Sequence, residues 1–226
     1  MMANRESASH SRIRARPSAR DHARAARRDT YRNLVLEAAA HAFARDGIPN
    51  TKMGHLAEQA GLSLGTLYSV YRGKAEIVDA LHEARLREIH AASVAAEAAG
   101  SDPLDALLAG SRAYINYFIE NPDYLRMYID EGANWGVRHS MDGKSRRAAV
   151  WAEGVAQLAA IIERGIEAGV FEPGRPDRLA RTMLAMQQVQ LADWLEDGMS
   201  AEPESVMADV DRLIRRAFCT QTWREH

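Results

Sequence analysis

Apolar residues recur at intervals of three and four positions along most of the chain, which is the spacing that an amphipathic helix requires. The first such stretch runs from about Arg32 to Gly47, and Gly47 followed by Pro49 is typical of the end of a helix. No segment alternates apolar and polar residues as a half-buried strand does, and there is no βαβ pattern and no internal repeat. We therefore predict an all-α fold.

Two short helices are expected directly after the first one. Thr51 is placed to cap a helix that extends to about Ala60, and Gly61 then fits a sharp turn with positive φ. Ser63 is placed to cap the next helix, over residues 64–70. A helix, a tight glycine turn and a second helix form a helix-turn-helix, although many αα-corners share this spacing.

Further helices bring the predicted total to about nine and divide the chain into two parts. A three-helix helix-turn-helix domain is expected over residues 31–82, and a larger helical domain over residues 83–226. Gly73, Gly100 and Gly169 separate the later helices, and residues 132–144 are predicted to form a loop. The predicted limits of these helices are about residues 74–99, 103–118, 124–131, 150–168, 177–195 and 203–218.

The charge of the chain is unevenly distributed. The 226 residues carry a net charge of −2, yet residues 1–82 hold 13 Lys and Arg against 8 acidic residues, and the remainder holds 16 against 23. Nine Arg and three acidic residues lie between Met1 and Arg32, where no apolar periodicity is present. We predict a disordered basic arm over residues 1–30, which is either an inert solvated leader or an arm that follows phosphates or enters a minor groove.

Several classes of protein are excluded by what the sequence lacks. Its apolar runs are far shorter than the ~20 residues of a membrane span. The N-terminal segment has no apolar region of a secretory signal, and the lone Cys219 allows no intramolecular disulfide, so a cytoplasmic location is expected. There is no Gly-rich phosphate loop, no GxSxG and no HExxH. We expect no enzymatic activity, no cofactor and no metal site.

Residues 34–81 resemble the DNA-binding domain of the TetR family of one-component transcriptional regulators. The resemblance is carried by A-x-x-x-F-A-x-D-G at residues 39–47, by Thr51, by LAEQAGLSLGTLY at residues 56–68, and by Lys74. The chain departs from the family pattern at Val70, where His is common, at Tyr71, where Phe is usual, and at Gly73, where a better capping residue often stands. Beyond about residue 85 the resemblance is architectural only.

The resemblance implies which residues contact DNA. It places the start of the third helix nearest the bases, but no Arg, Asn or Gln stands there to make bidentate contacts, so we expect this helix alone to read sequence weakly. Tyr68 and Lys74 stand at positions that resemble the phosphate-contacting positions of the family. Alanine at either position is expected to weaken DNA binding without unfolding the protein. The predicted DNA-binding residues are Thr51, Lys52, Leu64, Gly65, Thr66, Tyr68, Ser69, Arg72 and Lys74.

The C-terminal part is expected to form a homodimer and to bind a ligand. The last two helices carry more apolar surface than one core requires, and the family dimerises through them. Aromatic and Met side chains with a few amides are expected to line a pocket for a small, apolar or aromatic effector. The predicted ligand-binding residues are Tyr114, Phe118, Met127, Trp135, Trp151, Met183, Gln187 and Gln190.

The predicted function is that of a sequence-specific transcriptional regulator. The resemblance implies a repressor that binds a palindromic double-stranded DNA operator and is released when its effector favours a state with wrongly spaced recognition helices. The alternative is a helical module that binds DNA non-specifically, or binds proteins, without a ligand response. A protein-binding module would not require the salt-sensitive DNA affinity that the basic arm, Tyr68 and Lys74 would provide.

Overall fold

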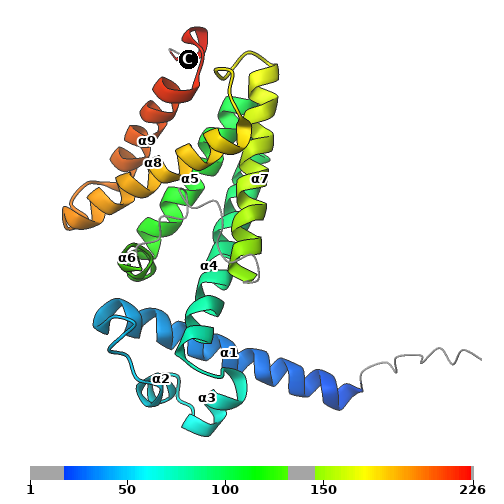
Figure 1. Cartoon of the computed structure of the whole chain (residues 1–226), viewed down its shortest axis with the longest axis vertical. Coiled ribbons are helices and arrows are strands. Elements are labelled where there is room, and N and C mark those ends of the chain that lie inside the picture. Colours follow the sequence, from blue (N-terminus) through cyan, green and yellow to red (C-terminus); the bar gives the residue numbers. More distant parts are fainter. Residues whose placement is uncertain (1–17, 132–145, 225–226) are drawn as a thin grey trace, which may run out of the picture.

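The computed structural model describes residues 18–131 and 146–224, which fold into nine α-helices and one short 3-10 helix, Gln221–Trp223 (Figure 1). In this part of the chain the only β-structure is an isolated bridge between Phe171 and Cys219. The prediction of an all-α fold with about nine helices is confirmed. The helices are α1 (Ala19–Asp46), α2 (Met53–Gln59), α3 (Leu64–Val70), α4 (Lys74–Glu97), α5 (Pro103–Glu120), α6 (Pro122–Asp130), α7 (Arg146–Glu167), α8 (Pro176–Glu196) and α9 (Pro203–Phe218).

Helix α1 starts much earlier than predicted. Disorder over residues 1–30 is wrong for residues 19–30, which form the first turns of α1. Ser18 and Asp21 make a capping box in which the Ser18 hydroxyl accepts from the Asp21 amide and the Asp21 carboxylate accepts from the Ser18 amide. Ala and Arg, which dominate these turns, are good helix formers. Residues 1–17, including the alternating Arg12, Arg14 and Arg16, lie outside the described residues.

The turns of the helix-turn-helix are formed largely as the sequence indicates. Gly61 has φ +66°, in the left-handed region, and the Ser63 hydroxyl caps α3 by accepting from the Thr66 amide at 3.1 Å. The predicted cap by Thr51 is wrong. Lys52 occupies the N-cap of α2, and the Thr51 hydroxyl instead donates to the Gly47 carbonyl at 2.9 Å, which holds the loop against the end of α1.

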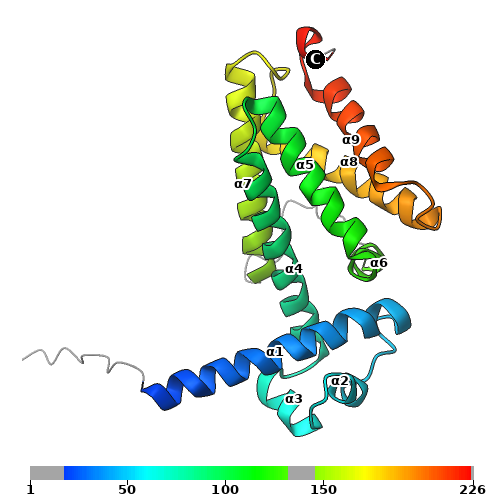
Figure 2. The same ribbon diagram turned by 180° about the vertical axis from the view of Figure 1, so that it is seen from behind.

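The helices form two parts that share α4. Helices α1, α2 and α3 pack around Phe43, Leu56 and Leu67, all fully buried, while the N-terminal half of α1 projects beyond the body. From this end α4 rises into the larger part, where it lies beside α5 and α7, and α8 and α9 flank α5 on another side (Figures 1 and 2). The helix runs unbroken across the predicted domain boundary at residue 82. Because α4 contributes to both parts, it is a continuous link between the helix-turn-helix and the larger part.

Candidate functional site

Helix α3 presents one face to solvent and packs with the other. Leu67 and Val70 are buried in the core, whereas Leu64 and Tyr68 are 46% and 50% exposed. Gly65 and Ser69 are exposed on the same side. A Cβ at Gly65 would have only the Ser63 hydroxyl nearby, at 3.9 Å, so this part of the helix surface is open to close approach. Four of the predicted DNA-binding residues thus share one exposed face.

The polar side chains of α3 are partly engaged within the helix. The Thr66 hydroxyl lies 2.8 Å from that of Ser63, and the Ser69 hydroxyl donates to the Thr66 carbonyl at 2.7 Å. With these hydroxyls bonded locally, Leu64, the Thr66 methyl group and Tyr68 are the groups with most freedom to contact another molecule. The helix carries no charged side chain.

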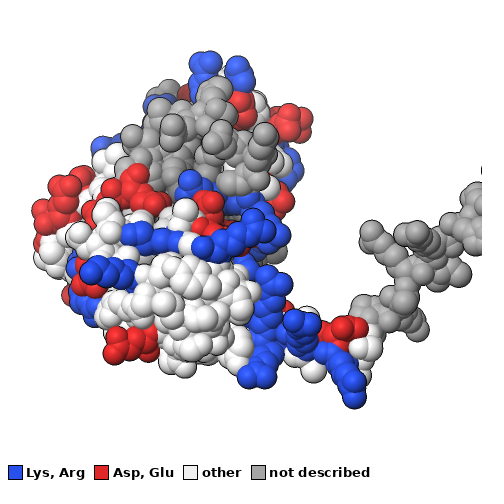
Figure 3. Space-filling model, turned by 60° about the horizontal axis from the view of Figure 1, so that its bottom comes forward, with Lys and Arg blue, Asp and Glu red and all other residues white. Residues whose placement is uncertain are grey.

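Basic side chains surround this uncharged face. Lys52 and Arg72 are exposed at the start of α2 and just after α3. Arg20, Arg24 and Arg28 follow one another at intervals of four residues on the projecting half of α1, and intervals of four place them on one side of the helix. Viewed from below, the underside of the molecule is largely uncharged with Lys and Arg beside it and along the projecting helix (Figure 3). The arrangement suits a polyanion that contacts α3 and extends past it.

Two predicted DNA contacts have structural roles instead. The Lys74 ammonium, at the first residue of α4, donates to the carbonyls of Ile48, Pro49 and Thr51, which uses all three of its protons. Thr51 was expected to offer a free backbone amide to a phosphate, but this amide donates to the Gly47 carbonyl at 3.2 Å, and the residue is only 3% exposed. These contacts were not predicted because the folding of residues 48–51 against α4 is not visible in a local motif.

The larger part of the molecule encloses a cavity of about 70 Å³ between α4, α5, α7 and α8. Most of its lining is apolar. Four of the predicted ligand-binding residues lie in its wall: Tyr114, Trp151, Met183 and Gln187. Gln187 is completely buried, and its amide nitrogen donates to the Ser111 hydroxyl. Of the two amides that were expected to line a pocket, Gln187 thus lies in the cavity wall.

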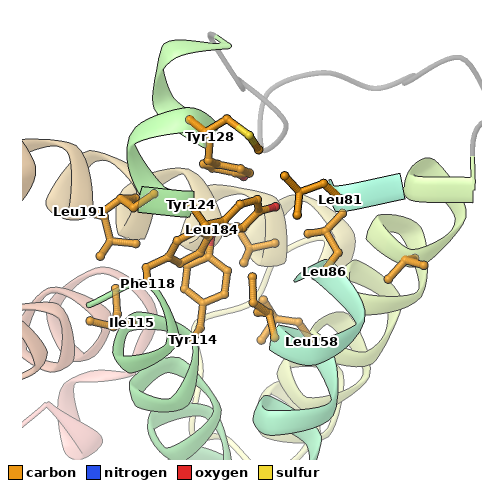
Figure 4. Close-up of a cluster of buried hydrophobic side chains, with 14 of the residues drawn as sticks. Leu81, Leu86, Tyr114, Ile115, Phe118, Tyr124, Tyr128, Leu158, Leu184 and Leu191 are labelled. Carbon is orange, nitrogen blue, oxygen red and sulfur yellow. The ribbon is translucent and has the colours of Figure 1, made fainter. Parts of the chain in front are cut away.

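The other predicted ligand residues lie elsewhere. Phe118 belongs to an aromatic core in which its ring is stacked on Tyr124, 5.7 Å away and 6° from parallel, and lies 5.3 Å from Tyr128 (Figure 4). Met127 is buried on α6 and faces the end of α1, beside Phe43. Gln190 is outside the cavity lining and is half-buried on α8. Trp135 lies outside the described residues.

Sequence reasoning missed the polar residues that α4 contributes to the cavity. His90, Ser93 and Glu97 line it, and the Ser93 hydroxyl donates to the Gly110 carbonyl of α5 at 3.3 Å. Glu97 accepts a hydrogen bond from the Gln157 amide of α7 at 3.1 Å. The spacing of His90, Ser93 and Glu97 places them on one face of α4, which could have indicated a polar site. Polar residues at such intervals are, however, also typical of an ordinary solvent-exposed helix face.

Comparison with known proteins places the chain in a family. Residues 35–81 match the family model described as "Bacterial regulatory proteins, tetR family". The chain is 25% identical over 185 residues to the uncharacterized HTH-type transcriptional regulator YhgD of Bacillus subtilis (strain 168), covering 77% of this chain and 90% of YhgD. The TetR-family regulator PfmR of Thermus thermophilus is 28% identical with a TM-score of 0.64, covering 80% of this chain and 97% of PfmR.

Residues 35–81 thus form a DNA-binding domain of the TetR family of bacterial regulatory proteins. A TetR-family regulator of Marinobacter aquaeolei VT8 has the same fold, with a TM-score of 0.70 at 21% identity over 87% of this chain and all of that one. The chain is accordingly a DNA-binding transcriptional regulator and not an enzyme. Within the described residues, no helix combines the length and apolar character that crossing a membrane requires.

A polar network joins α4, which leads out of the helix-turn-helix, to α6 and α7 of the larger part. His82 on α4 is fully buried and hydrogen-bonds Tyr124 and Glu131, while Arg147 of α7 lies 3.2 Å from Asp79. Burial raises the pKa of Glu131, but the hydrogen bond from His82 and the attraction of His82 and Arg147 outweigh burial and leave the pKa below its ordinary value. Glu131 is thus a carboxylate that links the end of α6 to α4, close to the C-terminal end of α1.

Proposed function

We propose that this TetR-family regulator is a repressor that binds a palindromic operator as a homodimer and leaves it when a small, largely apolar ligand enters the cavity. The observation that carries the proposal is the exposed, uncharged face of α3, which has basic side chains beside it. The same molecule holds an internal cavity, and α4, which follows α3 in the chain, forms part of the cavity wall. A cytoplasmic location goes with this proposal, since the bacterial chromosome lies there.

The proposed DNA contacts follow from exposure. Leu64, Gly65, Thr66 and Tyr68 would lie against the floor and edges of the major groove, with Ser69 beside them. Without a bidentate donor on α3, sequence preference would come from apolar contact with thymine methyl groups and from DNA shape. Lys52 and Arg72 would contact phosphates.

The proposed ligand response uses the continuity of α4. The middle and the end of α4 form part of the cavity wall. Lys74, the first residue of α4, donates hydrogen bonds to three carbonyls of the loop between α1 and α2. A ligand that binds better when α4 is displaced would change the separation of the two α3 helices in a dimer and so reduce operator affinity.

The proposed dimer interface is formed by α8 and α9. Val189 on α8 is 56% exposed, the highest value among the large apolar side chains of the described residues. Such a side chain is stabilised by a partner that covers it. We propose that a second copy of the chain does so across a two-fold axis, which would place two α3 helices about one turn of DNA apart.

Val189→Asp is expected to weaken dimerisation at least tenfold, because a carboxylate would be buried in the interface without a partner. The measurement is sedimentation equilibrium over a range of protein concentrations. Val94→Asp is the matched control: Val94 is 37% exposed on α4, away from α8 and α9, and this variant should remain as dimeric as the unmodified protein. Equal dimer affinity for both variants would place the interface elsewhere.

Replacing Arg24 and Arg28 by glutamine is expected to weaken DNA binding and to reduce the slope of log K against log salt by up to about 1.8, since each lost phosphate contact removes about 0.9. These residues lie on the exposed basic row of α1. The matched control replaces Arg87 and Arg212, which are 57% and 59% exposed on α4 and α9, and should leave the slope unchanged. An unchanged slope in the first variant would show that the projecting helix does not contact DNA.

The proposed function as a whole is tested by incubating the purified full-length protein with random DNA duplexes and sequencing those retained. Enrichment of a palindrome with half-sites about one helical turn apart supports the proposal. Retention without any enriched sequence, by protein that is folded and dimeric, supports the alternative of a non-specific DNA-binding module. No retention at all contradicts a DNA-binding role.

A further inference from the structure

The cavity between α4, α5, α7 and α8 carries polar groups that its apolar walls do not satisfy. Three buried atoms in its lining, His90 Nε2, the Tyr114 hydroxyl oxygen and Gln187 Oε1, have no hydrogen-bond partner among the described residues. Buried polar atoms without a partner are destabilising and infrequent, and each calls for a physical explanation. Because Gln187 is completely buried and its amide nitrogen is bonded to Ser111, its carbonyl oxygen is left as a free acceptor.

Glu97 adds a carboxylate to the same region of the cavity. It packs against Gly110, where an added Cβ would come within 2.7 Å of the Glu97 Cγ and Oε1 atoms, so the missing side chain of Gly110 makes room for the carboxylate. Gly110 and Ser111 are neighbours on α5, and they contact Glu97 and Gln187 respectively. Consecutive residues of α5 therefore contact two hydrogen-bond acceptors of the cavity lining, one from α4 and one from α8.

The Glu97 carboxylate has little compensation for its burial. Its hydrogen bond is to the neutral amide of Gln157, and within the described part of the chain no Lys, Arg or His lies within 4.0 Å of its oxygens. Burial raises the pKa of Glu97 above its ordinary value, against the hydrogen bond from Gln157 and the attraction of His90 and Arg164. No Lys or Arg belongs to the described lining of the cavity. A bound cation would stabilise this carboxylate.

Building on the proposed effector response, we propose that the cavity binds a small amine, whose ammonium group donates to the Glu97 carboxylate and the Gln187 carbonyl oxygen while its apolar body lies against Trp151 and the aliphatic wall. An ammonium group supplies three donors, which matches a site rich in acceptors. A carboxylate ligand would bring a second negative charge next to Glu97 and is selected against. The ligand class is therefore an aliphatic or aryl-alkyl amine rather than an organic acid.

The test compares three probes of nearly the same size by isothermal titration calorimetry on the full-length protein at neutral pH: benzylamine, benzyl alcohol and benzoate. Benzylamine is expected to bind at least tenfold more tightly than benzyl alcohol, and benzoate more weakly than both. Absence of benzylamine binding at millimolar concentration, or benzoate binding as tightly as benzylamine, would overturn the proposal.

Two variants locate the amine. Glu97→Gln keeps the size of the side chain and its contact with Gly110 but removes the charge, and should reduce benzylamine affinity at least tenfold while benzyl alcohol affinity stays unchanged. Gln187→Leu should reduce benzylamine affinity by removing the second acceptor, and it provides an independent test if Glu97→Gln folds poorly. Glu163→Gln, an exposed acid of α7 outside the cavity lining, is the control and should change nothing. Unchanged benzylamine affinity in Glu97→Gln would refute the assignment.

The readout separates this inference from the proposed function. Probe binding is measured without DNA, and DNA binding is measured by the duplex selection without probe. A protein that selects a palindrome but shows no preference for benzylamine contradicts the amine proposal alone. A protein that prefers benzylamine but retains no DNA contradicts the repressor proposal alone.

Discussion

Gly165→Ala is expected to lower the free energy of unfolding by about 3 kcal/mol, near the upper end of what overpacking in a close-packed interior costs. Gly165 is buried near the end of α7, and an added Cβ would lie 2.1 Å from Phe171 Cδ2 and 2.2 Å from Cε2. Phe171 is 1% exposed, and its backbone is fixed by a hydrogen bond to the Gly165 carbonyl and by the bridge to Cys219. The ring therefore has no free space into which to move.

Gly154→Ala is the matched control on the same helix. An added Cβ at residue 154 would meet no heavy atom within 4 Å. Alanine is favoured over glycine inside a helix by about 1 kcal/mol, so this variant should be more stable than the unmodified protein. Urea and thermal unfolding of the two variants measure the difference. If both substitutions shift stability in the same direction, the close packing of Phe171 on α7 is not what makes Gly165 necessary.

The helical framework could be predicted from local sequence signals because each signal acts within one turn. Ser63 caps α3 as the sequence indicates, Gly61 adopts the positive φ expected of it, and Gly169 follows the end of α7 as predicted. The early start of α1 was missed for a different reason. A helix that packs on nothing needs no apolar periodicity, and Ser18 with Asp21 three residues later was the signal that remained.

The cavity could be predicted only in outline. Tyr114 and Phe118 lie one turn apart on α5 and share a helix face, yet only Tyr114 lines the cavity and Phe118 stacks on Tyr124. Periodicity identifies the buried face of a helix, but it does not distinguish a core position from a cavity wall, because that depends on how far apart the neighbouring helices lie. Glu97 can lie in the cavity wall because Gly110 on the neighbouring helix has no side chain. No local sequence pattern reveals this contact between helices.

Lys74 is the clearest case in which a contact with a distant part of the chain could not be predicted from a local pattern. The family pattern favours a lysine at this position, and a lysine at a helix start next to a recognition helix was predicted to bind phosphate. In the structure its ammonium lies instead among the carbonyls of Ile48, Pro49 and Thr51, which come from more than twenty residues earlier in the chain. Lys52, in contrast, is exposed at the start of α2 and makes no described side-chain contact.

Lys74→Ala is therefore expected to lower the free energy of unfolding by about 3 kcal/mol, because it leaves three carbonyls without their charged donor and each hydrogen bond to a charged group contributes about 1.5–3 kcal/mol where it is buried. Two of the three bonds are only partly buried and one is exposed, which keeps the total below the roughly 4.5 kcal/mol that three buried bonds would contribute at the lower value. DNA affinity should fall as well, since the loop that positions α2 and α3 loses its anchor.

The salt dependence of DNA binding separates this structural role from a phosphate contact. At a temperature where the Lys74→Ala protein is still folded, its log K against log salt should have the slope of the unmodified protein, because no phosphate contact is lost. Lys52→Ala should show the reverse, with unchanged stability and a slope lower by about 0.9. A Lys74→Ala protein that is fully stable but shows the reduced slope would restore the phosphate contact predicted from sequence. The two variants together thus show which lysine contacts a phosphate and which stabilises the DNA-binding domain.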